Sequence, residues 1–106
     1  MAAESAFERL LIRRLMELYP GAVILKNDAN NLQGFPDRTI LWRDRWACLE
    51  VKASGSSPHQ PNQDYYVDLL NHMSYSSFVY PSNLKDVLHG LQLSFRAQRP
   101  TRLLER

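Results

Sequence analysis

The sequence predicts an α/β fold in which helices flank a mixed sheet. Three observations lead to this class: an amphipathic repeat near the N-terminus, three short apolar runs after it, and a further helix, strand and helix in the second half. This order of elements is that of an α/β sandwich with a mixed sheet. The chain has 106 residues and fits one domain, with a core expected over about 4–91 and a basic tail over 92–106.

The first predicted helix spans about Ser5 to Tyr19, where apolar residues recur at helical spacing. The pair Pro20-Gly21 ends it. Ala22 to Lys26 then predicts a short strand, and the polar residues 27–33 predict a loop before the turn that begins at Gly34.

Two apolar runs, 39–42 and 46–49, are separated by the charged residues 43–45 and predict a hairpin. A turn centred between Arg43 and Asp44 pairs residue 42 with 45, and the same register brings Asp37 opposite Glu50. Arg-Asp is not a favoured two-residue turn, so a looser loop is the alternative.

The second half begins with a flexible connection at 55–58 and a helix from about Pro61. Residues 77–80 predict a fourth strand. Ser82 or Asn83 can cap a last helix that runs through Leu91.

Composition narrows the function classes. The formal net charge of +2 permits nucleic-acid binding without demanding it, and the single cysteine, Cys48, leaves no disulfide and no recognisable zinc ligand set. The apolar runs are too short to span a membrane, and residues 1–5 lack the basic and apolar segments of a signal peptide, so we expect a soluble, cytoplasmic protein.

The residues with the clearest chemistry are Asp37, Glu50 and Lys52. Side chains alternate along a strand, so Glu50 and Lys52 share one face, and the hairpin register places Asp37 on that face as well. Mg²⁺ prefers hard oxygen ligands and keeps several waters, so two carboxylates can hold it against a phosphate. Lys52 would orient a water or neutralise charge that develops on phosphorus.

The ordered set of Gly34-Phe35-Pro36-Asp37, Glu50-Val51-Lys52 and then Gln63 resembles the PD-(D/E)XK nuclease superfamily. Within it, the chain is most similar to the small, stand-alone virus-type replication-repair nuclease (VRR-NUC) domains. Their pattern runs from a helix glutamate through G-x-P-D and E-x-K to a glutamine, and the resemblance covers roughly residues 4–91.

This resemblance implies a restriction-endonuclease-like αβββαβ core and a metal-dependent DNA endonuclease that uses Mg²⁺, with Mn²⁺ as a substitute. It also implies the Val51 carbonyl as a metal ligand, four-way junctions or other branched DNA as substrates, a homodimer, and a phage-infected or bacterial host cell. The alternatives are a restriction-type or nicking nuclease on ordinary duplex DNA, and a binding module that keeps the fold without catalysis.

Two further positions of the pattern each have two candidates. Glu8 lies on the apolar side of the first helix and fits the family's helix acid, with Glu4 as the reserve, but Glu8 also fits a capping box with Ser5. Gln63 matches the family glutamine by its distance from Lys52, with Gln60 as the alternative.

Four cations are candidates for contacts with the DNA backbone. Lys26 ends the first strand, and the others come from the arginine-rich end of the chain: Arg96, Arg99 and Arg102.

Overall fold

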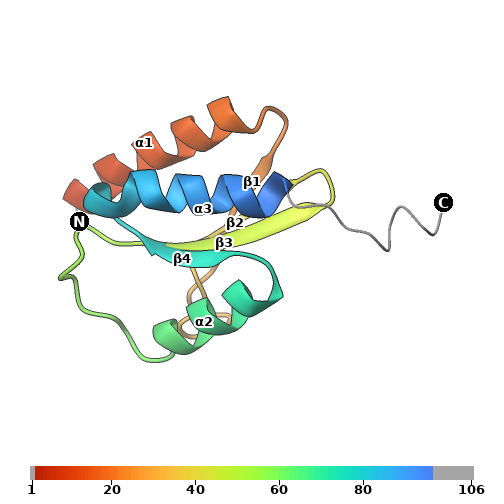
Figure 1. The fold of residues 1–106 in the computed structure, drawn as a ribbon. Coiled ribbons are helices and arrows are strands. Elements are labelled where there is room, and N and C mark those ends of the chain that lie inside the picture. The colour runs from red at the N-terminus through yellow and green to blue at the C-terminus, as the bar shows by residue number, and fades with distance from the viewer. Residues whose placement is uncertain (1, 97–106) are drawn as a thin grey trace.

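The computed structural model describes residues 2–96 and arranges them as helices on both faces of one sheet (Figure 1). The elements, in chain order, are α1 (Ala2–Leu18), β1 (Val23–Lys26), β2 (Arg38–Trp42), β3 (Arg45–Val51), α2 (Gln63–Met73), β4 (Ser76–Val79), the short 3₁₀ helix η1 (Pro81–Asn83) and α3 (Leu84–Arg96). No helix within this range has the length and hydropathy that crossing a membrane requires.

The sheet has the order β1-β2-β3-β4. The pairs β1–β2 and β2–β3 are antiparallel and the pair β3–β4 is parallel, which confirms the mixed sheet expected from the sequence. Helices α1 and α3 lie together on one face and α2 covers the other (Figure 1). The parallel pair is possible because α2 connects the ends of β3 and β4.

The β2–β3 hairpin has the predicted register. Trp42 pairs with Arg45 and Leu41 with Trp46, so the connection is a two-residue turn rather than a looser loop. Arg43 adopts a left-handed backbone with φ 58°. Its guanidinium lies 4.3 Å from the centre of the Trp42 ring, a cation–π contact that offsets part of the backbone strain.

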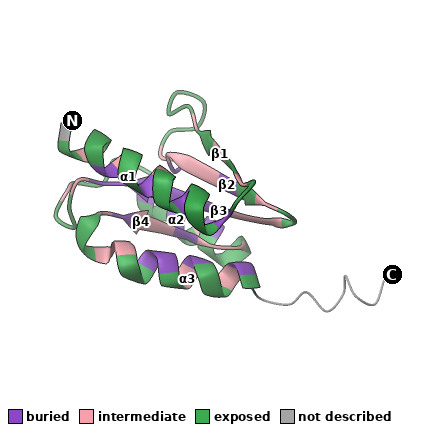
Figure 2. Cartoon of the chain, turned by 90° about the horizontal axis from the view of Figure 1, so that it is seen from above, coloured by how far each residue is buried: buried purple, intermediate pink, exposed green. Residues whose placement is uncertain are grey.

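The two faces of β3 have different roles. Ala47, Leu49 and Val51 point toward α1 and α3 and belong to the main core, whereas Glu50 and Lys52 point to the α2 side. Figure 2 shows the buried positions as repeated bands along α3 and in the central strands. The core contains these buried residues: Phe7, Leu11, Leu15, Tyr19, Ile40, Ala47, Leu49, Val51, Val79, Val87, Leu88, Leu91 and Phe95.

The last helix extends beyond the expected end of the core. It runs to Arg96 rather than Leu91, and Phe95 is only 3% exposed. Its ring contacts Tyr19 edge-on at 5.1 Å and stacks on Trp42 at 5.9 Å. Residues 92–96 therefore belong to α3, and Phe95 belongs to the core, because the apolar repeat of the helix continues one further turn.

We expect Phe95→Ala to lower the free energy of unfolding by about 3–5 kcal/mol, because it removes a buried ring from the contact between α1 and the hairpin. Leu93→Ala is the matched control, since Leu93 is on the same helix and 51% exposed. Urea unfolding of both variants measures the difference. Equal, small losses would show that the core ends before Phe95.

Candidate active site

Three polar side chains are buried together where β3 meets the start of α2. Glu50 is 4% exposed, Lys52 7% and Gln63 8%. Burying a charged group is unfavourable unless it is paired or hydrogen-bonded. Their contacts therefore decide whether this cluster is a structural ion pair or a site with a further purpose.

The amide of Gln63 connects the two charged groups. Its Nε2 donates to Glu50 Oε2 at 3.0 Å, and its Oε1 accepts from Lys52 Nζ at 2.8 Å. The backbone N–H of Gln60 also donates to Gln63 Oε1 at 2.8 Å. The structure thus brings the Gln63 side chain into the site, while Gln60 supplies a backbone donor that fixes the amide.

Asp37, the residue directly before β2, contacts the strand that carries this cluster. Its Oδ2 accepts a hydrogen bond of 2.8 Å from the backbone N–H of Val51. The N–H and C=O of one strand residue point toward the same neighbouring strand, so the Val51 carbonyl also lies on the Asp37 side. The shared face predicted for Asp37, Glu50 and Lys52 is therefore present.

The Glu50 carboxyl is electrostatically unusual. Burial first and the neighbouring Asp37 second raise the pKa of Glu50 from 4.5 to about 8, while Lys52, at 3.8 Å, opposes the rise. Glu50 Oε1 is buried and has no hydrogen-bond partner. A buried carboxylate oxygen without a partner is satisfied by a proton or by a cation.

A cavity of ≈ 460 Å³ opens beside these carboxylates. Asp37, Glu50 and Gln63 line one side, and the loop of residues 27–36 lines another. The loop between β1 and β2 and the approach to α2 therefore form the walls of a polar cavity with two acids inside it.

Gly34 lets these two loops touch. It has φ +90°, and a Cβ at this position would lie 2.6 Å from both the Pro61 carbonyl oxygen and Asn62 Cβ. The Asn62 side chain reaches back to the carbonyl of Gln33 at 3.5 Å. The glycine of the motif is thus required for close backbone approach as well as for the turn.

Asn27 holds the segment that presents Asp37. Its backbone N–H donates to the carbonyl of Asp37 at 2.7 Å, and its side-chain Nδ2 donates to the carbonyl of Pro36 and to Thr39 Oγ1, both at 2.9 Å. The sequence indicated only a polar loop here. The one available signal was an asparagine directly after a strand, a position where such side chains often bond to nearby backbone.

The prediction that Glu8 joins the carboxylates is not supported by the structure. Glu8 Oε2 accepts a 2.7 Å hydrogen bond from Arg38 Nε and forms an ion pair with it. Arg38 follows Asp37, so its side chain points to the opposite face of the sheet, toward α1. The helical wheel correctly placed Glu8 on the inward side of α1, but it could not show which sheet residue would meet it.

In the part of the chain that it describes, the structure also lacks the two other arrangements that the sequence suggested for α1, a capping box at Glu8 and a metal-site role for Glu4. The helix begins at Ala2, so Ser5 lies inside it and the proposed capping box with Glu8 does not form. Across residues 2–96, no three His, Cys, Asp or Glu side chains gather as a metal-binding group, so Glu4 does not join Asp37 and Glu50 either.

The remaining ligand set still suits one particular class of cation. The carboxylates of Asp37 and Glu50, the latter with its unpartnered Oε1, and the Val51 carbonyl offer hard oxygen atoms and no sulfur or imidazole. Such a set matches Mg²⁺ or Mn²⁺, which complete their coordination with water and substrate oxygens.

Two of the cations proposed to contact DNA lie away from this cavity, and the other two are not among the residues that the structure describes. Lys26 pairs with Arg38 in the β1–β2 register, so its side chain is on the α1 face of the sheet. Arg96 is exposed in the last turn of α3. Arg99 and Arg102 fall outside residues 2–96.

No protein-family model, curated protein or solved structure matches this chain. The resemblance to VRR-NUC domains that the sequence led us to expect therefore rests on the motif residues and their order alone.

The raised pKa of Glu50 predicts how stability depends on pH. Between about pH 4.5 and 8 the folded protein keeps a proton that the unfolded chain has released, so stability falls as pH rises through this window. In EDTA, we expect a loss on the order of a few kcal/mol that is absent in Glu50→Gln. Denaturant melts at several pH values measure it, and parallel profiles for the two proteins would contradict the burial of an acidic Glu50.

Replacing Gly34 tests the contact between the loops. Gly21 and Gly34 both have positive φ, but a Cβ at Gly21 meets nothing within 4 Å. We therefore expect Gly21→Ala to cost only the backbone strain of about 1–2 kcal/mol and Gly34→Ala to cost more, since the loops must separate. Thermal melts compare the two variants; equal losses would mean that the loop contact contributes nothing.

Proposed function

We propose that this chain is a Mg²⁺- or Mn²⁺-dependent DNA endonuclease with the restriction-endonuclease-like αβββαβ core of the PD-(D/E)XK superfamily, similar to VRR-NUC domains. One observation supports this best. Glu50 is a buried carboxylate whose Oε1 lacks a partner while Asp37 disfavours its ionisation. Two carboxylates placed in this way are relieved when a divalent cation takes the place of the proton.

The roles of the acidic residues follow from the ligand chemistry. Asp37 and Glu50 would hold the cation, with the Val51 carbonyl as a third oxygen. When bound, a Mg²⁺ ion polarises a phosphoryl oxygen and lowers the pKa of a water, which is what phosphodiester hydrolysis requires. The water oxygen forms the new bond to phosphorus, the bond to the leaving oxygen breaks, and no covalent intermediate with the protein is needed.

Lys52 has a donor left for the substrate. Its Nζ donates to the carbonyl of Pro58 at 3.0 Å and to Gln63 Oε1 at 2.8 Å. An ammonium group has three N–H donors, so one remains. This donor would orient the attacking water or stabilise charge on the phosphoryl oxygens, and Gln63 keeps the lysine at a fixed distance from Glu50.

A binding module without catalysis is the alternative from another class. Binding to phosphates is driven by cations, whereas Asp37 and Glu50 place negative charge in the cavity. Such a module gains nothing from a buried acid, and the carboxylates therefore favour the enzyme.

We expect Asp37→Asn, Glu50→Gln and Lys52→Ala each to reduce cleavage on the order of 10²- to 10³-fold, the cost of losing one preorganised contact in the transition state. Asp68→Asn is the control, because Asp68 is on α2 with a side chain that is 78% exposed. Labelled DNA is incubated with each protein and Mg²⁺ or Mn²⁺, and circular dichroism confirms folding. Full activity in any two of the three site variants would refute the assignment.

The substrate proposal adds a second part to that experiment. The family resemblance favours branched DNA, a homodimer and the cytoplasm of a phage-infected or bacterial host, whereas a restriction-type or nicking nuclease would cut ordinary duplex. Labelled duplex, flap and four-way-junction substrates separate these alternatives, and light scattering measures the mass. A monomer that cuts linear duplex as readily as junctions would select the second alternative and leave the catalytic residues unchanged.

A further inference from the structure

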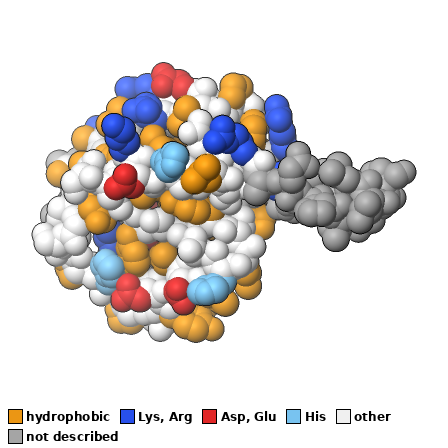
Figure 3. All heavy atoms as spheres, viewed as in Figure 1, with side chains coloured by type: hydrophobic (Ala, Val, Ile, Leu, Met, Phe, Trp, Pro, Cys, Tyr) orange, Lys and Arg blue, Asp and Glu red, His pale blue; other side chains and the backbone are white. Residues whose placement is uncertain are grey.

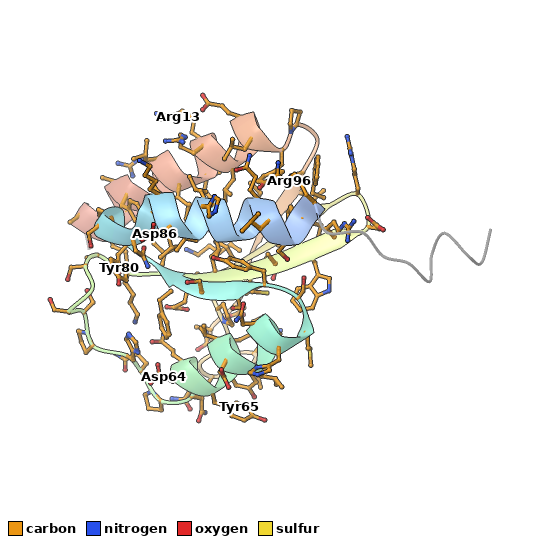
Figure 4. All side chains as sticks on the ribbon, in the orientation of Figure 1. Arg13, Asp64, Tyr65, Tyr80, Asp86 and Arg96 are labelled. Atoms are coloured by element: carbon orange, nitrogen blue, oxygen red, sulfur yellow. The ribbon has the colours of Figure 1, made fainter. Side chains whose placement is uncertain are left out.

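Charge is divided between the two sides of the molecule. Figure 3 shows Lys and Arg side chains over α1, with an acidic side chain among them, while Asp and His side chains lie over α2 and α3. Helix α2 (Gln63–Met73) contains neither Lys nor Arg. In Figure 4, Arg13 is on the α1 side and Asp64 and Tyr65 are on the opposite, α2 side. The charge that favours a polyanion therefore lies on the α1 side, on the face of the sheet opposite the carboxylate cavity.

A groove of ≈ 570 Å³ runs between α1 and the start of β2. The residues that matter in its lining are Glu8, Arg9, Ile12, Arg13, Met16 and Arg38. Arg9 and Arg13 are exposed, and neither makes an ion pair with another residue in the range 2–96. They are four residues apart, so they lie on one side of the helix, about 6 Å apart along its axis.

This groove and the carboxylate cavity lie on opposite faces of the sheet, both at the start of β2. Arg38 lines the groove, and the preceding residue, Asp37, lines the carboxylate cavity. Lys26 is the partner of Arg38 in the β1–β2 register and adds another exposed cation on the same face of the sheet. Glu8 neutralises Arg38, so Arg9, Arg13 and Lys26 supply the net positive charge.

We propose that the Arg9–Arg13 groove binds the phosphate backbone of the substrate DNA, on the other face of the sheet from the carboxylate cavity. This inference rests on the proposed nuclease function. Arg9, Arg13 and Lys26 form an exposed cationic surface on the α1 face of the sheet, which suits a polyanion. Such contacts hold the DNA in register without reading its sequence.

The test compares two double variants that remove the same charge from two different grooves. Arg9→Gln with Arg13→Gln changes the proposed groove. Arg14→Gln with Lys85→Gln changes a separate groove between α1 and α3, which those two exposed residues line. Binding of fluorescent duplex DNA is titrated over a salt series in EDTA, so that no cleavage occurs, and circular dichroism verifies folding.

For the Arg9/Arg13 variant, the slope of log K against log salt should flatten by about 2, since each lost phosphate contact removes about 0.9. The Arg14/Lys85 variant should keep the wild-type slope. Equal slopes in all three proteins, or equal flattening in both variants, would contradict the proposal that this groove binds DNA.

A parallel cleavage assay with Mg²⁺ separates this inference from the proposed function. If wild-type protein cuts DNA while the Arg9/Arg13 variant keeps the wild-type salt slope, the groove does not bind DNA, but the proposed nuclease function is supported. If the salt slope flattens only in the Arg9/Arg13 variant and no protein cuts any substrate, the groove binds DNA, but the proposed nuclease function is wrong.

Discussion

The burial of Glu50 is the constraint on which the rest of the site depends. Glu50 is 4% exposed and lies beside Asp37. Burial and the neighbouring acid destabilise the charged form of Glu50 and raise its pKa to about 8. The Gln63 amide makes this arrangement possible because it donates to Glu50 while it accepts from Lys52. Without that bridge, Glu50 Oε2 would lose its hydrogen-bond donor and Lys52 would lose one of its two acceptors, and such losses are costly for buried charged groups.

The loops around the sheet extend this arrangement to Asp37. Asn27 bonds the segment from Pro36 to Thr39, and Val51 fixes the carboxylate itself through its backbone N–H. The two loops meet at Gly34, where a side chain has no room. Asp37, Glu50 and Lys52 are therefore held in place by contacts within the protein, which is the preorganisation that the proposed hydrolysis would require.

Strand periodicity made much of the site predictable, because a period of two fixes which residues share a face once the hairpin register is known. That argument placed Asp37, Glu50 and Lys52 together. It could not identify the partner of Glu8, since this depends on how α1 packs over Arg38. Asn27 was missed for a similar reason: its contacts join segments 9 to 12 residues apart, and no local pattern encodes them.

The central claim is that Asp37 and Glu50 form a site where a divalent cation takes the place of a proton. Calorimetric titration of the protein with Mn²⁺ at pH 7, in two buffers of different ionisation enthalpy, measures the protons released on binding. With a Glu50 pKa of about 8, we expect about one proton released per ion and no release in Glu50→Gln. Binding without proton release, or equal binding by wild type and an Asp37→Asn/Glu50→Gln double variant, would contradict the account.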